Sequence, residues 1–137
     1  MTPNSSTLAP APPKQYILSR VGSQCVAFDE RAVSSILLIE RSQVLALPFY
    51  DDVISGIVHH QGQIITLVAL GHLLENMPGQ IREVFNAVQL GESTGLAGLA
   101  LIVDQLMGQC GADQMAANQA TEFQPQDLGP ALWQPRR

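Results

Sequence analysis

The amino-acid sequence predicts a mainly β protein, built as one small all-β barrel or a pair of such barrels. Short apolar runs of strand length recur along the chain, and glycine-containing turns separate them at intervals of about ten residues. Hydrophobic residues make up 46% of the 137 residues, but aromatic residues make up only 5%. The core is therefore expected to be aliphatic, and the chain length suits a single domain.

The first part of the chain predicts a tail, a hairpin and a third strand. Residues 1–13 contain four prolines and no charge, so they bury too little apolar surface to offset the entropy of ordering, and we expect a disordered tail. The stretches QYILSRV and QCVAFD predict two strands joined at Gly22 and Ser23. In ERAVSSILLIE, the apolar spacing predicts a helical turn that leads into another strand.

A second hairpin is predicted after the polar turn FYDD. Two apolar runs, residues 53–58 and 64–70, flank the stretch HHQGQ. Gly62 lies in that stretch and can adopt the positive φ that a tight hairpin turn requires. We therefore expect Gly62 to be a structural residue of the turn and not a binding residue.

A third hairpin is predicted from VFNAVQL and LAGLALIV, which flank the loop GESTG. This loop also fits G-x-S-x-G, the nucleophile elbow of serine hydrolases, which needs a strand before the serine and a helix after it. The hydrolase order of serine, acid and histidine is not met, because His59, His60 and His72 all precede Ser93. A small serine esterase using Ser93 therefore stays a minor alternative to a hairpin loop.

The remaining sequence sets the domain boundaries. Residues 112–137 are rich in Gln and Pro, and we expect them to be only partly ordered. The predicted organisation is thus a tail over residues 1–13, a folded domain over 14–111 and a C-terminal segment over 112–137.

Composition and motifs exclude several classes of function. The net charge is −5, and Lys14 is the only lysine, which disfavours nucleic-acid binding. Cys25 and Cys110 form no C-x-x-C pair and are interpreted as small buried hydrophobes. The adjacent His59 and His60 would point to opposite faces of a strand, so they cannot share a metal ion. No cofactor, metal site or membrane insertion is expected, and a cytoplasmic location is the default.

The stretch LPFYDDVISGIVHHQGQIITLVALGHLL resembles the CheW family, the coupling proteins of bacterial chemosensory arrays. Members typically read G-[VI]-x-N-L-R-G-x-[IV]-[VI]-P-[VI]-x-D-L at this place. This chain keeps that frame at Pro48, Gly56, Ile57, Val58, Gly62, Ile64, Ile65, Leu67, Val68 and Leu70. Upstream, YILSRVGSQCVAFDERAVSSIL is similar to the family's two opening strands and short helix. Downstream, VFNAVQLGESTGLAGLALIVDQLMG is similar to its later hairpin. The resemblance covers residues 15–108 and implies two small SH3-like β-barrels with short helical segments.

The chain departs from the family pattern at identifiable positions. His59, His60 and Gln61 stand where members have Asn-Leu-Arg, and Ser35 aligns with a frequent glutamate. Thr66 and Ala69 replace the usual proline and aspartate. Replacing the arginine removes a charged fork that a glutamine cannot supply, which bears on receptor coupling. The sequence stops where members continue to a last strand and helix, so it leaves open whether the second barrel is complete.

The resemblance implies a non-catalytic adaptor that couples a CheA-type histidine kinase to the cytoplasmic tip of methyl-accepting-type receptors, in arrays at the inner face of the membrane. Contacts are expected on the hairpin that begins at Val53 and on a short helix ending near Ile36. The implied partner-binding residues are Val33, Ser35, Ile36, Ile57, His59 and Gln61. The alternative is a degenerate CheW-like domain that dimerises or inhibits without receptor coupling, and the sequence leaves a homodimer open.

Overall fold

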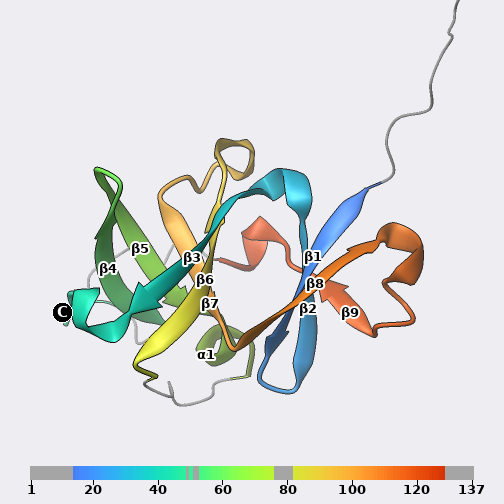
Figure 1. Cartoon of the computed structure of the whole chain (residues 1–137), viewed down its shortest axis with the longest axis horizontal. Helices are drawn as coiled ribbons and strands as arrows, with labels where there is room; N and C mark the ends of the chain where they lie inside the picture. Colours follow the sequence, from blue (N-terminus) through green and yellow to red (C-terminus); the bar gives the residue numbers. More distant parts are fainter. Residues whose placement is uncertain (1–13, 49, 51–52, 76–81, 129–137) are drawn as a thin grey trace, which may run out of the picture.

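The structure is a computed structural model that describes residues 14–48, 50, 53–75 and 82–128 (Figure 1). These residues form a four-stranded sheet in the order β8-β1-β2-β9 and a five-stranded sheet in the order β3-β6-β7-β5-β4. The mainly β fold predicted from the sequence is therefore confirmed. The predicted tail, residues 1–13, lies outside the described residues.

The four-stranded sheet combines the two ends of the described chain. It contains β1 (Gln15–Val21), β2 (Gln24–Asp29), β8 (Gln105–Gly111) and β9 (Ala120–Glu122). β1 pairs antiparallel with both β2 and β8, and β2 pairs in parallel with β9. The predicted first hairpin is confirmed, with Gly22 at a φ of 60° in its turn.

The five-stranded sheet holds the middle of the chain. Its strands are β3 (Val33–Glu40), β4 (Ile54–His60), β5 (Gln63–Ala69), β6 (Val84–Leu90) and β7 (Leu99–Val103). The pairs β4–β5 and β6–β7 are the two antiparallel hairpins predicted from the sequence, and β5 pairs in parallel with β7. A short helix, α1 (Leu70–Glu75), follows β5 directly, so Leu70, the last residue of the predicted apolar run, belongs to the helix and not to the strand.

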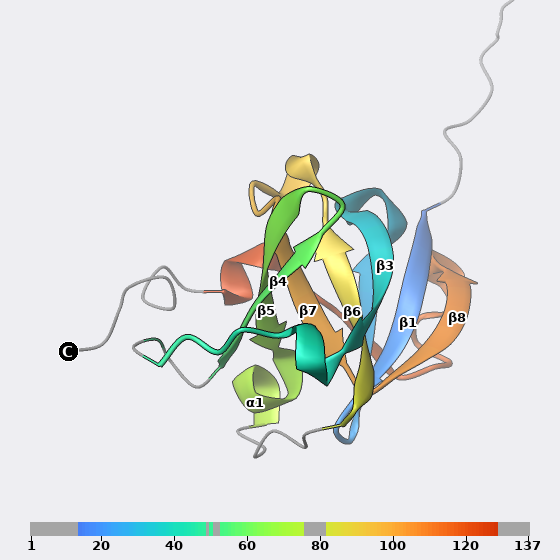
Figure 2. The same cartoon turned by 60° about the vertical axis from the view of Figure 1, so that its left-hand side comes forward.

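The five-stranded sheet curls into a half-barrel (Figures 1 and 2). After β3, the 3-10 turn η2 (Arg41–Gln43) redirects the chain toward the far end of the sheet. Leu45 and Ile57 then exchange backbone hydrogen bonds of 2.8 and 2.9 Å. This single bridge connects the segment after β3 to β4 and holds the curl.

Aliphatic side chains fill three clusters. The largest lies between the two sheets and includes Phe28, Leu90 and Leu101, all essentially buried. A second fills the half-barrel around Ile65 and Leu67. A third and smaller one lies on the other face of the four-stranded sheet. The expectation of an aliphatic core is thus met.

One local expectation was wrong. The helical turn η1 (Glu30–Ala32) ends before Val33, and the residues after it belong to β3, so no helix reaches Ile36. β3 pairs with β6 from Val33 to Glu40, and this ladder supplies backbone hydrogen bonds that the spacing of apolar residues alone does not reveal.

The turn at Gln61 and Gly62 connects β4 and β5 with only two residues. Gly62 has a φ of 78°, which confirms the predicted positive value, and Gln61 has a φ of 49°. Two successive positive φ values are typical of a type I′ turn, whose twist matches that of the flanking strands.

Residues beyond Gly111 contribute to the core. Besides β9, Phe123 and Leu128 are buried in the cluster between the sheets. The rings of Phe28 and Phe123 lie with centroids 5.5 Å apart. Within the described residues, no helix has the length and apolar character that crossing a membrane requires.

Candidate protein-interaction surface

The outer face of the β4–β5 hairpin carries exposed aliphatic side chains. Val58 and Ile65 point into the half-barrel, so their neighbours Ile57 and Ile64 point outward because strand side chains alternate. Ile64 lies directly opposite His59 on β4, and Leu45 lies opposite Ile57. We call Leu45, Ile57, His59 and Ile64 the hairpin face. Leu45 is 64% exposed and Ile64 is 58% exposed, so this face presents two large aliphatic side chains to solvent.

A chain of polar side chains spans the adjoining end of the half-barrel. The Ser35 hydroxyl on β3 donates to Gln89 Oε1 on β6 at 2.8 Å. The Gln89 amide then donates to Gln63 Oε1 on β5 at 3.5 Å. Gln89 is only 8% exposed, so Ser35 satisfies a polar group whose burial without a partner would be costly.

This polar end borders a groove of about 430 Å³. Gln63, Gln89 and Ile64 line one side, and the loop around Gly91 and Gly98 lines the other. The groove is neutral apart from Glu92. It therefore suits an apolar or amide-bearing group better than an acidic one.

The six predicted partner-binding residues do not form one surface. Ile57, His59 and Gln61 lie together on the hairpin. Ser35 instead points into the half-barrel, and Val33 is partly buried against the core between the sheets. Ile36 is 39% exposed on the outer face of β3.

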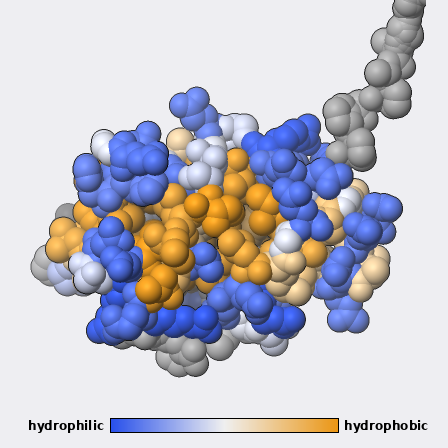
Figure 3. Space-filling model, in the orientation of Figure 1, coloured by the Kyte–Doolittle hydropathy of each residue, from blue (hydrophilic) through white to orange (hydrophobic). Residues whose placement is uncertain are grey.

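Several exposed hydrophobic residues were missed by the sequence analysis. They are Leu38, Leu45, Ile64, Val84 and Met107. Apolar side chains form a band across the face of the molecule that carries β3, between hydrophilic margins (Figure 3). The runs SSILLIE and GQIITL gave no signal for Leu38 and Ile64, because continuous apolar runs do not reveal which alternate positions face solvent.

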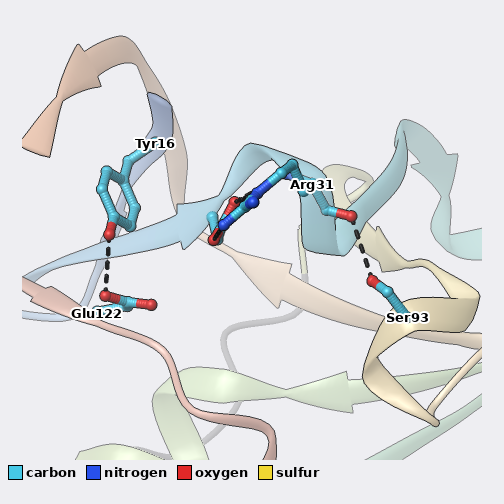
Figure 4. A network of polar contacts seen from close by, with 5 residues as sticks. Tyr16, Arg31, Ser93 and Glu122 are labelled. Carbon is cyan, nitrogen blue, oxygen red and sulfur yellow. Dashed lines mark hydrogen bonds and ion pairs between the residues drawn. The ribbon is translucent and has the colours of Figure 1, made fainter. Parts of the chain in front are cut away.

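The G-x-S-x-G loop is the connection of a hairpin and not a nucleophile elbow. Ser93 lies in the short 3-10 turn η3 (Glu92–Thr94), and the chain continues into β7 where an elbow would require a helix. The Ser93 hydroxyl donates to the Arg31 carbonyl oxygen at 3.3 Å (Figure 4). Ser93 borders an open cavity of about 410 Å³, whose described lining residues include no histidine.

Polar contacts beside this cavity lie within the four-stranded sheet and the η1 turn that follows β2. The Tyr16 hydroxyl on β1 donates to Glu122 on β9 at 3.2 Å (Figure 4). Arg31 forms an ion pair of 3.2 Å with Asp29. Hydrogen bonds from the Arg31 side chain lower the pKa of Asp29, and burial followed by the bond to Glu122 raises the pKa of Tyr16. The bond from Ser93 to the Arg31 carbonyl, together with the 2.8 Å bond from the Gly91 N–H to the Ala32 carbonyl, holds η1 against the η3 loop.

The cysteines and histidines form no ligand cluster in the described part of the chain. Cys110 is buried, and burial raises the pKa of its thiol, while Cys25 is partly buried; both are free. A buried thiol of raised pKa is a poor nucleophile. Among residues 14–48, 50, 53–75 and 82–128, no three His, Cys, Asp or Glu side chains are placed to hold a metal ion.

Two curled β-sheets pack across one aliphatic core and leave apolar side chains exposed on their outer faces. This arrangement defines a paired half-barrel module of the kind that binds other proteins. This chain belongs to the family of CheW-like domains, whose model matches residues 15–131. The match includes the C-terminal segment up to that residue and so extends past the resemblance over residues 15–108. CheW-like proteins are scaffold proteins of chemotaxis and not enzymes.

The crystal structure of the scaffolding protein TtCheW from Thermoanaerobacter tengcongensis has a similar fold. It superposes with a TM-score of 0.57 at 16% sequence identity. The match covers 73% of this chain and 66% of that chain, just under two thirds of its length. None of the curated proteins compared with this chain matches it.

Proposed function

We propose that this chain is a non-catalytic adaptor that couples a CheA-type histidine kinase to the cytoplasmic tip of methyl-accepting-type receptors, in arrays at the inner face of the membrane. Membership of the CheW-like family supports the adaptor role. The observation that carries the proposal for this chain is the exposed aliphatic hairpin face, because contiguous apolar surface on a folded protein usually marks a protein contact.

The hairpin face is the proposed contact surface for one partner. Of its residues, Ile57 and His59 are sequence-predicted contact residues, and a third, Gln61, lies in the adjoining turn. Val33 and Ser35 act differently in this proposal: they support the surface by packing on the core and by bonding Gln89. Gln61 stands where the family has arginine, so recognition depends on apolar burial more than on ion pairing.

A titration tests this proposal. Wild-type protein and Ile64→Asp are titrated against the CheA-type kinase and the receptor tip encoded with this chain, at low and high salt. Wild type should bind both partners with weak dependence on salt. Ile64→Asp should bind one of the two partners at least about tenfold more weakly, because an unpaired charge would be desolvated in the contact.

A matched control is Met107→Asp, since Met107 is 44% exposed on β8 in the other sheet. It should bind as wild type does. If neither partner binds wild-type protein at either salt concentration, the adaptor proposal is wrong, and a CheW-like domain that acts without receptor coupling replaces it.

A further inference from the structure

The strand β3 has a free edge. It stands at one end of the order of the five-stranded sheet, and β6 is the only described strand that pairs with it. The Arg41 N–H donates to the Glu83 carbonyl at 2.8 Å. Hydrogen-bonded residues alternate along an antiparallel ladder, so Leu37 and Ile39 also bond to β6. Ile36, Leu38 and Glu40 consequently direct their N–H and C=O groups toward the free edge.

A side-chain contact supports this assignment. The Glu40 N–H donates to Gln43 Oε1 at 2.9 Å, on the side away from β6. The chain thereby satisfies the last donor of the edge by itself. Within the described residues, the edge-facing N–H and C=O groups of Ile36 and Leu38 have no hydrogen-bond partner.

Apart from a β-bulge near its start, between Val33 and Ser35, this edge lacks the usual protection against strand addition. Natural edge strands are short, or carry charged residues, prolines or inward-pointing charges. β3 has eight residues, and residues 33–39 include neither a charge nor a proline. Leu38 is 71% exposed and Ile36 is 39% exposed on its outer face, so both the backbone and the side chains favour a further strand.

We propose that β3 of a second copy of this chain adds to this edge in antiparallel orientation, with Leu37 of both copies at the two-fold axis. Ile36 of each copy then lies opposite Leu38 of the other. Each of these two pairs exchanges two N–H···O=C bonds, and the aliphatic side chains meet on one face. The edge-facing N–H and C=O groups of Ile36 and Leu38 are thereby all used in both copies.

Neighbouring registers fit less well. A shift of two residues in one direction sets Ile36 against Glu40, whose N–H is already bonded to Gln43. The opposite shift sets Leu38 against Ser34, at the β-bulge between Val33 and Ser35. A shift of one residue would turn apolar side chains to the wrong face. The centred register is therefore the one that the groups at this edge favour for a second copy of β3.

Charge is compatible with the centred register. It sets Glu40 of each copy opposite the Ser34 hydroxyl of the other, which can donate to the carboxylate, and no two carboxylates face each other. The net charge of −5 per chain repels two copies at long range, and salt screens this repulsion. Self-association should therefore tighten as the salt concentration rises.

Sedimentation velocity across a wide concentration range tests the inference, together with residue-resolved amide hydrogen exchange. Wild type should pass from monomer to dimer, and the amides of Ile36 and Leu38 should become protected as concentration rises. Leu38→Pro removes an edge donor that plays no part in the β6 ladder, so the fold should persist. It should raise the dissociation constant of the dimer by about tenfold or more, because two hydrogen bonds are lost by symmetry.

Leu38→Lys gives a second variant that leaves the backbone unchanged, and it should also shift the equilibrium to monomer. Ile64→Lys is the matched control, because Ile64 is similarly exposed but lies on the hairpin face; it should dimerise as wild type does. Three outcomes would overturn the inference. Wild type could stay monomeric, the Leu38 variants could dimerise normally, or the dimer could be lost only in Ile64→Lys. The Leu38 variants should still bind the kinase and the receptor tip. The inference rests on dimerisation alone, so its failure can be told apart from failure of the proposed function.

Discussion

Gly56 should be the glycine that this fold can least replace. It lies at the β-bulge of β4 with a φ of 147°, a conformation that side-chain-bearing residues rarely adopt. A Cβ atom on Gly56 would overlap the carbonyl oxygen of Leu45 and come within 2.8 Å of Val44 Cγ1. The Gly56→Ala variant must therefore displace the segment that holds the half-barrel curled.

The expected cost follows from what that displacement breaks. Leu45 and Ile57 exchange two backbone hydrogen bonds of 2.8 and 2.9 Å, each with a net value of about 1 kcal/mol. The disfavoured φ adds about 1–3 kcal/mol. The free energy of unfolding should accordingly fall by about 3–5 kcal/mol in Gly56→Ala.

Urea denaturation followed by far-UV circular dichroism measures this loss, with Gly62→Ala as the matched control. Gly62 also has a positive φ, 78°, but a Cβ there would meet nothing within 4 Å. Its cost should be backbone strain alone, about 1 kcal/mol. Equal losses in the two variants would refute the argument, because they would show that the close approach of Leu45 does not matter.

Three further outcomes are expected. Arg31 lowers the pKa of Asp29 in the folded state, so this carboxylate stabilises the fold at neutral pH. The stabilisation is lost as pH falls through the folded pKa of Asp29. In Arg31→Gln, the urea midpoint should therefore fall less between pH 7 and about pH 3 than in wild type. Phe123→Ala should lower stability by about 3 kcal/mol, measured by thermal and urea unfolding, and an unchanged midpoint would place the C-terminal segment outside the core. Ser93→Ala should leave stability nearly unchanged, and wild type should not react with a fluorophosphonate probe; labelling at Ser93 would contradict the assignment of a hairpin loop.

The sequence by itself determined the class of the fold and the positions of its hairpins. Apolar runs of strand length and glycines able to adopt positive φ are local signals, because each sets the backbone conformation of its own short segment. The hairpin at Gly62 is predictable because turn and strands lie within about 20 residues. The family pattern around Gly56 and Gly62 identifies the domain as CheW-like, since it includes glycines that this fold requires at those positions.

Tertiary structure alone decided which apolar residues are exposed and which polar residues meet. Val33 and Leu38 lie in one apolar strand, yet the second sheet packs against Val33 and leaves Leu38 in solvent. Ser35 and Gln89 are 54 positions apart and form a hydrogen bond only because β3 pairs with β6. Such contacts depend on how the strands are ordered in the sheet, and a strand's own residues specify its pattern of alternation but not the neighbour that covers it.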